Sequence, residues 1–172
     1  MTEQYVNCLL NTKLLPESKL EDLIKKYPDI VNWTYIARHQ KLSEKFIEKY
    51  QDKINWNIIS VHQKLSESFI EKFKDKVDWN TISAYQKLSE SFIEKFKDKV
   101  DWEGITIYQK LSESFIEKFK DKVLWWYISG HFKLSPKFII KHIDKITRHI
   151  FRNKYYERFP DNIKILLKLK VK

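Results

Sequence analysis

Glycine and proline are scarce in this sequence of 172 residues. Glycine occurs only at Gly104 and Gly130, and proline occurs four times. Folds rich in β-structure need glycine in their tight turns, so the composition argues against them. The scarcity also excludes a glycine-rich loop of the kind that binds phosphates. The single cysteine, Cys8, permits no disulfide within the chain, which is typical of a reducing compartment.

Long apolar runs are missing as well. No stretch approaches the ~20 apolar residues of a membrane-spanning helix. Residues 1–15 have neither a basic start nor an apolar run, so we expect no secretory signal. With 42% hydrophobic and 33% charged residues, the composition is that of a folded, soluble chain. We therefore expect a cytoplasmic protein with no transmembrane segment.

A tandem repeat with a period of 23 residues dominates the sequence. Residues 63–77, 86–100 and 109–123 are the same segment, QKLSESFIEKFKDKV. One tryptophan marks each unit, at Trp33, Trp56, Trp79, Trp102 and Trp125. A unit this short cannot bury its apolar side chains alone, but stacked neighbours can, so the period predicts an array.

The repeat divides a single domain, residues 1–172, into three segments. Residues 32–147 hold the five repeats. Residues 1–31 are expected to form an N-terminal cap that contains a degenerate half-repeat. Residues 148–172 are expected to form a basic C-terminal cap, in which the pattern is lost and one or two helices are separated near Pro160.

Each repeat predicts two short helices, A and B. In the third repeat, Asp78 is a suitable N-cap for a helix A that begins at Trp79, and Ser89 is a suitable N-cap for helix B. The apolar residues of helix B, from Phe92 to Val100, fall in one arc, as expected of a face that packs on a core. The sequence therefore predicts an all-α fold, an α-solenoid of 23-residue helix-turn-helix repeats with capping segments at both ends.

The segments DWNTISAYQKLSESFIEKF and DWEGITIYQKLSESFIEKF resemble short tandem repeats in uncharacterised proteins of giant viruses that infect amoebae, the relatives of mimivirus. The resemblance covers residues 32–147, roughly two-thirds of the chain, and the fifth repeat and the tail depart from it. It implies a viral protein that acts in the host cytoplasm or is packaged in the virion. The family has no assigned activity, so the resemblance implies no functional residues.

Helix A varies between repeats, whereas helix B is identical in the second, third and fourth repeats. With the tryptophan as position 1, the variation is concentrated at positions 2, 3 and 6, while position 7 alternates between histidine and tyrosine. We interpret positions 2, 3 and 6 as a surface that binds a protein partner. This helix-A face comprises Tyr35, Arg38, Asn57, Val61, Asn80, Ala84, Glu103, Ile107 and Trp126. The alternative is drift after recent duplication, which the identical segments also indicate.

Most of the positive charge lies at the C-terminal end. The net charge is +10, and residues 133–172 hold twelve lysines and arginines against three acidic residues, a balance of +9. On a continuous helix, five of these cations would form one basic stripe, consisting of Lys137, Lys141, Lys145, Arg148 and Arg152. The stripe predicts contact with nucleic-acid phosphates or an acidic membrane surface, and a solubilising cap is the other interpretation.

No pattern predicts catalysis, a cofactor or a metal site. Ser60, Ser83 and Ser129 lack the glycine turn of a nucleophile, so we interpret them as small residues at helix contacts. The histidines of position 7 recur at most once per repeat, too far apart to surround one metal ion. The tryptophans are expected in the core between repeats, and the charges of helix B in solvated ion pairs at helical spacing.

We therefore expect a non-enzymatic protein that binds another protein, of unknown identity, through the helix-A face. Nucleic-acid binding through the basic stripe and a structural role in the virion are the alternatives. The sequence leaves the oligomeric state open.

Overall fold

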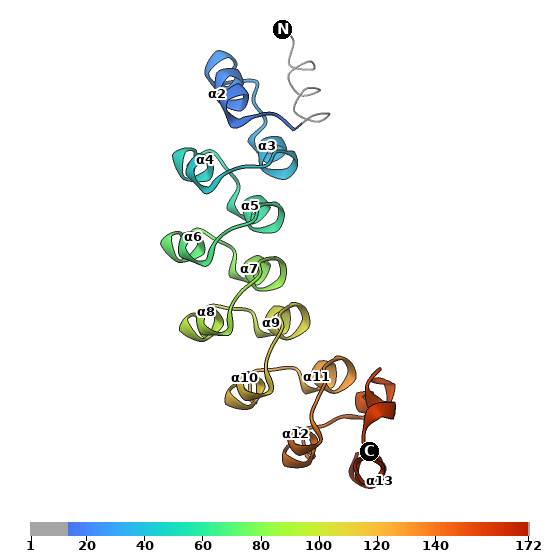
Figure 1. The fold of residues 1–172 in the computed structure, drawn as a ribbon. Coiled ribbons are helices and arrows are strands. Elements are labelled where there is room, and N and C mark those ends of the chain that lie inside the picture. The colour runs from blue at the N-terminus through green and yellow to red at the C-terminus, as the bar shows by residue number, and fades with distance from the viewer. Residues whose placement is uncertain (1–13, 172) are drawn as a thin grey trace. The chain divides into compact units, whose positions relative to one another are not determined.

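The structure, a computed structural model, describes residues 14–171 of the chain. Within this range every regular element is a helix and there is no strand, which confirms the all-α prediction. The fold is an α-solenoid of 23-residue helix-turn-helix repeats with a capping segment at each end (Figure 1). Cys8 and the rest of residues 1–13, which belong to the expected N-terminal cap, lie outside the described residues, as does Lys172.

The chain divides into two compact units, residues 1–87 and 88–172, and the boundary falls between the two helices of the third repeat. The helices of the first unit are α2 (Glu17–Lys26), α3 (Trp33–His39), α4 (Glu44–Lys49), α5 (Trp56–His62), α6 (Glu67–Lys72) and α7 (Trp79–Tyr85). Those of the second are α8 (Glu90–Lys95), α9 (Trp102–Tyr108), α10 (Glu113–Lys118), α11 (Trp125–His131), α12 (Pro136–Lys141), the 3-10 helices η1 (Arg148–Arg152) and η2 (Tyr156–Arg158), and α13 (Asp161–Lys170). Within a unit the A helices, such as α3, α5 and α7, stack in one row and the B helices in another (Figure 1).

Side-chain caps start the helices where the sequence predicts them. The carboxylate of Asp78 accepts a hydrogen bond from the N–H of Thr81 at the start of α7. The hydroxyl of Ser89 accepts one from the N–H of Phe92 at the start of α8. Each bond satisfies an N–H that has no partner within the helix, and such a cap contributes ~1 kcal/mol.

Helix B is shorter than the sequence analysis expects, because α8 ends at Lys95 and does not continue to Val100. The chain then forms a turn in which the N–H groups of Lys99 and Val100 bond to the carbonyl of Phe96, at 2.9 and 3.0 Å. Phe96 and Val100 remain buried. Since this segment contains neither glycine nor proline, packing rather than a local helix breaker ends the helix.

The core of a repeat consists of isoleucines and aromatic rings. Ile59 of α5 and Ile70 of α6 are fully buried. The half-buried Trp56 ring lies beside Phe69 of α6 and Phe73, the residue after α6, with 6.3 and 4.9 Å between ring centroids. These ring contacts join the two helices of one repeat. The Nε1 group of Trp56 also donates to the carbonyl of Gln51 in the preceding repeat, at 3.2 Å, so the tryptophan contacts both repeats and agrees in part with the expected place between them.

A buried glutamine at position 8 joins a repeat to the one before it. The Nε2 group of Gln63 donates to the carbonyl oxygens of Ala37 and Gln40, at 2.7 and 2.8 Å, and its Oε1 accepts from the N–H of Leu42 at 2.9 Å. Gln86 makes the same three bonds one repeat later. The two carbonyls lie at the C-terminal end of helix A, where no intrahelical N–H reaches them, so the glutamine satisfies groups that the helix leaves unpaired. We call these residues the rungs.

Charged side chains of helix B and of the turn after it also connect consecutive repeats. Glu48 pairs with Lys72 at 2.6 Å, and Asp52 pairs with Lys76 at 3.3 Å. The second unit contains the same two kinds of pair. The partners are 24 residues apart, so these pairs link consecutive repeats, whereas the sequence analysis expects pairs within one helix.

Glu21 and Lys49 form such a pair at 2.7 Å, and their hydrogen bond lowers the pKa of Glu21 below 4.5 and raises the pKa of Lys49 above 10.5. The contribution of the pair to stability is complete between these two values. It is lost as the pH falls through the folded-state pKa of Glu21, or rises through that of Lys49. We expect Glu21→Gln to lower the melting temperature slightly at neutral pH, because the pair is exposed, and to have no effect at about pH 2. Thermal unfolding followed by circular dichroism checks this, and an equal difference at both pH values would contradict it.

The N-terminal half-repeat is a B helix that is longer than the others. α2 has ten residues, where α4 has six. Glu17 of α2 accepts hydrogen bonds from the N–H and the hydroxyl of Ser43, and Glu44 accepts from the N–H of Ser66 in the same way one repeat later. The predicted half-repeat therefore caps the first full repeat with the contacts that a complete repeat would make.

The C-terminal cap contains a further rung, which the sequence analysis missed. The Nδ2 group of Asn153 donates to the carbonyls of Ser129 and Phe132, both at 2.8 Å, which are positions 5 and 8 of the fifth repeat. η1 packs against α11 as one helix A packs against the next. The expectation that the pattern is lost after residue 147 is therefore wrong. The segment NKYYERF, residues 153–159, corresponds to QKLSESF of the inner repeats. Its first residue, Asn153, lies 21 residues after position 8 of the fifth repeat, whereas position 8 recurs every 23 residues in the other repeats.

Candidate functional site

Helix A turns its variable positions away from the core. At 100° per residue, positions 2, 3, 6 and 7 fall in one arc of about 140°, and positions 1, 4, 5 and 8 fall on the opposite side. Ile36, Ile59 and Ile82 at position 4 are buried, as are Ser60 and Ser83 at position 5. Position 2 is exposed in all five repeats and can change without disturbing the packed interior, whereas position 3 is half-buried or, at Gly104, buried.

Exposure divides the helix-A face into two sets. Five members are exposed, namely Arg38, Asn57, Asn80, Glu103 and Trp126. Four are half-buried, namely Tyr35, Val61, Ala84 and Ile107. Residues 35–84 of this set belong to the first unit and residues 103–126 to the second. Each unit thus carries its own row of accessible, varied side chains.

The most exposed aromatic side chains of helix A lie at position 7, which is not part of the helix-A face. Tyr85 and Tyr108 are 65% and 64% exposed. His39, His62 and His131 hold the same position and are exposed too. The sequence carries a signal for this surface, because position 7 holds a ring side chain in all five repeats.

An exposed lysine at position 9 follows position 8 in every repeat. The backbone of Gln63 is extended, with φ −103° and ψ 150°. Successive side chains of an extended backbone point to opposite sides, so the lysine after each rung points away from the buried side chain of the rung. These lysines are Lys41, Lys64, Lys87, Lys110 and Lys133, and none of their side chains has an ion pair or hydrogen bond within residues 14–171. We call positions 7 and 9 together the A–B edge, because they flank the connection between helices A and B.

Grooves run along the A–B edge of the first unit. One groove of about 490 Å³ is lined by His62, Lys64, Tyr85 and Lys87, together with the two buried rungs between them. A second, of about 400 Å³, lies one repeat earlier and includes Arg38 in its lining. Each groove therefore combines ring side chains and cations from two consecutive repeats.

In the second unit the C-terminal cap continues the A–B edge. Arg152 and Lys154 flank the rung Asn153 in the sequence, as a ring and a lysine flank each glutamine, and both are exposed. The ammonium of Lys154 lies 5.1 Å from the centroid of the Tyr155 ring. The cap thus adds two cations and a ring to the edge.

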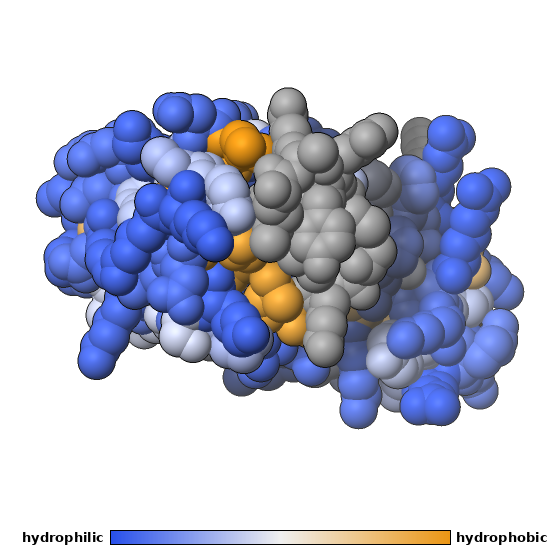
Figure 2. Space-filling view, turned by 90° about the horizontal axis from the view of Figure 1, so that it is seen from above, coloured by the Kyte–Doolittle hydropathy of each residue, from blue (hydrophilic) through white to orange (hydrophobic). Residues whose placement is uncertain are grey.

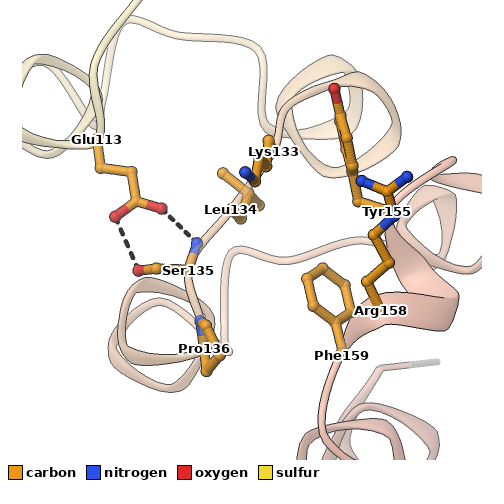
Figure 3. Close-up of a pocket in the computed structure, with 8 residues that line it drawn as sticks. All are labelled: Glu113, Lys133, Leu134, Ser135, Pro136, Tyr155, Arg158 and Phe159. Atoms are coloured by element: carbon orange, nitrogen blue, oxygen red, sulfur yellow. Dashed lines mark hydrogen bonds between the residues drawn. The ribbon is translucent and has the colours of Figure 1, made fainter.

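A pocket of about 350 Å³ lies between the fifth repeat and the cap. Figure 3 shows Lys133 on one side, with Tyr155, Arg158 and Phe159 on the other. The guanidinium of Arg158 lies 5.7 Å from the Tyr155 ring centroid. The carboxylate of Glu113 also lines the pocket, but it is bound to the N–H and hydroxyl of the N-cap serine of α12 (Figure 3). The pocket therefore offers two cations beside a ring and an apolar wall.

The five residues of the basic stripe do not lie on one helix. Lys137 and Lys141 belong to α12, Lys145 lies in the turn that follows, and Arg148 and Arg152 are the first and last residues of η1. Lys141 and Lys145 each pair with an acidic residue of the fourth repeat. The continuous-helix geometry is therefore wrong, because the chain must turn between α12 and η1, and two of the five cations are already paired.

Nucleophilic and metal-ligating residues are not gathered into a site in the part of the chain that the structure describes. The hydroxyls of Ser60, Ser83 and Ser129 donate to the carbonyl four residues earlier, at 2.7, 2.7 and 2.6 Å. No group of three or more His, Cys, Asp or Glu side chains in residues 14–171 could hold a metal ion.

Apart from the grey atoms, the surface on view in Figure 2 is mainly hydrophilic, and most of its visible apolar side chains lie in a narrow strip. No helix in residues 14–171 combines the length and the apolar character that crossing a bilayer requires. On this view, a partner would meet mainly polar and charged groups.

Comparison with protein-family models, with curated proteins and with solved structures finds no match to this chain.

Proposed function

We propose that this protein is a non-enzymatic repeat module that binds a protein partner through the helix-A face. The placement of the sequence variation supports the proposal. Positions 2, 3 and 6 differ between repeats and lie on the arc of helix A that faces away from the core, whereas helix B is identical in three repeats. Repeat proteins recognise partners through such a row of varied side chains on a constant scaffold.

The chemistry of the face suits a protein partner. In the first unit it combines the Tyr35 ring with exposed polar groups such as Arg38 and Asn57, and in the second unit it combines Trp126 with Glu103, mixtures that protein interfaces favour. Trp126 is 44% exposed and makes an edge contact with the Tyr127 ring, at 5.6 Å between centroids. A side chain that is held before binding loses less conformational entropy on binding.

Helix B has a different role in this proposal. Charged side chains of helix B and of the turn that follows it form the ion pairs between repeats, so the polar side of this segment stabilises the array. Helix A makes no such row of ion pairs in the part of the chain that the structure describes, which leaves its exposed side chains for recognition. The resemblance to giant-virus repeat proteins supports a location in the host cytoplasm or the virion, so an amoebal lysate is the first source of the partner.

Site-specific photocrosslinking tests the proposal. A benzophenone side chain introduced at Asn57 or Asn80, exposed on helix A, should capture one protein from the lysate. The same group at Lys53 or Lys74, exposed in the turns after helix B of the same unit, should capture none of it. With the benzophenone at Asn80, replacing Arg38 and Asn57 by alanine should reduce capture about tenfold, the loss expected when interface contacts worth ~1.4 kcal/mol are removed.

The melting temperature provides the control, since both alanine replacements are at exposed positions and should leave it unchanged. Capture should also survive nuclease treatment. Equal capture from the helix-A positions and from the turns after helix B would remove the argument for this face.

A further inference from the structure

We infer that the A–B edge of the second unit is a binding site for single-stranded nucleic acid, with phosphates on its cations and bases on its rings. The site is separate from the proposed function, because it uses positions 7 and 9 and not positions 2, 3 and 6. It shares only Arg152 with the basic stripe, whose members are dispersed over three segments and partly paired.

The edge presents one lysine per step, at Lys110, Lys133 and Lys154. The side chains of Lys110 and Lys133 are exposed and have no ion pair or hydrogen bond within the described part of the chain. Two lysines in the turns after helix B of the same unit, Lys122 and Lys145, are paired with aspartates. A row of unpaired cations creates a positive potential that attracts a polyanion and holds its phosphates.

The carboxylates near this edge are engaged with groups of the protein. Glu113 accepts hydrogen bonds from the N–H and hydroxyl of Ser135. Glu157, next to Arg158, pairs with Lys164 of α13 at 3.0 Å. Lys164 compensates the charge of Glu157, whereas Glu113 keeps its negative charge. Lys133 and Arg158 therefore outnumber the single carboxylate that lines the pocket.

Rings accompany the cations at each step. Tyr108 is 64% exposed. The exposed His131 ring is stacked on Tyr127 at 4.1 Å between centroids, and its Nδ1 lies 3.1 Å from the Tyr127 carbonyl oxygen, so the ring is held in place. At the pocket, the centroid of the Tyr155 ring lies 5.1 Å from the ammonium of Lys154 and 5.7 Å from the guanidinium of Arg158. Aromatic faces of this kind stack nucleobases with little dependence on base identity.

The rings favour a single strand over an acidic peptide or a duplex. An acidic peptide would require only the cations of the edge. A single strand offers both a phosphate and an unstacked base, which match the lysine and the ring of each step. A duplex would satisfy the lysines, but its bases are stacked inside the helix and would leave the rings unused.

Fluorescence anisotropy with a labelled single-stranded oligothymidylate and the full chain tests the site. We expect Lys110→Gln combined with Lys133→Gln to weaken binding at least ~10-fold. The salt dependence should also change, because each lost phosphate contact makes the slope of log K against log salt shallower by ~0.7. Between about 50 and 200 mM salt, the slope of the double variant should therefore be shallower by ~1.4 than that of the unmodified protein. Tyr108→Ala should weaken binding about tenfold, and Tyr108→Phe should retain it.

Lys97→Gln combined with Lys120→Gln is the matched control. It removes the same number of charges from exposed positions of the same unit, in the turns after helix B, and should change the affinity less than twofold. Equal losses in the two double variants would mean general attraction to a basic protein and would overturn the site. Absence of binding at low salt, or a duplex bound as tightly as the single strand, would also overturn it. Poly-glutamate bound with the same lysine dependence and no Tyr108 dependence would assign the edge to an acidic peptide instead.

Discussion

Replacing Gln63 with leucine is expected to lower the free energy of unfolding by about 3–5 kcal/mol. The Gln63 side chain makes three buried hydrogen bonds, to the carbonyls of Ala37 and Gln40 and from the N–H of Leu42. Leucine has a similar volume but leaves all three backbone groups without a partner. A buried hydrogen bond contributes ~1 kcal/mol net, and each backbone group left without a partner costs a further ~1–3 kcal/mol. The greater apolar burial of leucine and local relaxation offset part of this cost. Urea unfolding of the two proteins measures the difference.

Gln51→Leu is the control for this prediction, since it makes the same substitution within the same unit. Gln51 is only half-buried, and its Oε1 accepts one exposed hydrogen bond, from Lys76 at 2.8 Å. We expect a change of no more than ~0.5 kcal/mol. If Gln63→Leu and Gln51→Leu had the same small effect, the rungs would not be what joins consecutive repeats.

Asn153→Leu is expected to destabilise the attachment of the C-terminal cap by about 2–4 kcal/mol. Its Nδ2 group donates to the carbonyls of Ser129 and Phe132, and its Oδ1 accepts from the N–H of Tyr155 at 2.9 Å. Asn153 is only 4% exposed, so the variant buries these carbonyls without donors. Hydrogen exchange should show faster exchange in residues 148–171 than in α9 and α10, because local opening of the cap costs less free energy than global unfolding.

The exposed Asn162 of α13 supplies the comparison for the cap. Asn162→Leu introduces the same side chain into the same segment without removing a buried hydrogen bond, and we expect the exchange of η1 to be unchanged. Unchanged exchange in Asn153→Leu as well would show that apolar contacts of η1, and not the rung, hold the cap.

The sequence was sufficient for the helices and their starting points. The cap residues Asp78 and Ser89 act on N–H groups three residues away, so their effect is local and can be recognised from short segments. The end of helix B at Lys95 could not be recognised in this way, since the next three residues contain no helix breaker. That end depends on the burial of Phe96 and Val100 against other parts of the fold.

For the candidate surfaces, the sequence identified the variable positions of helix A but not the A–B edge. Variation between copies is visible without a structure, and the 3.6-residue period places positions 2, 3 and 6 on one side of the helix. The lysine of position 9 is constant, so comparison of the repeats gave it no weight. Its importance follows from exposure and the absence of a partner for Lys110 and Lys133 within residues 14–171.

The sequence by itself determined the period, the all-α class, the two helices of each repeat and the apolar face of helix B, because these depend on contacts within a few residues and on a repeated pattern. Only the tertiary structure decided what the polar residues do. The partners of Gln63 lie 21 to 26 residues away, and those of the helix-B lysines lie 24 residues away. A hydrogen bond or ion pair at that separation forms only when packing brings two repeats together, so composition and spacing carry no direct signal of it. For the same reason, the rung at Asn153 became recognisable only from the carbonyls that it binds. Its place in the sequence departs from the 23-residue period because the 3-10 helix η1 is shorter than a helix A.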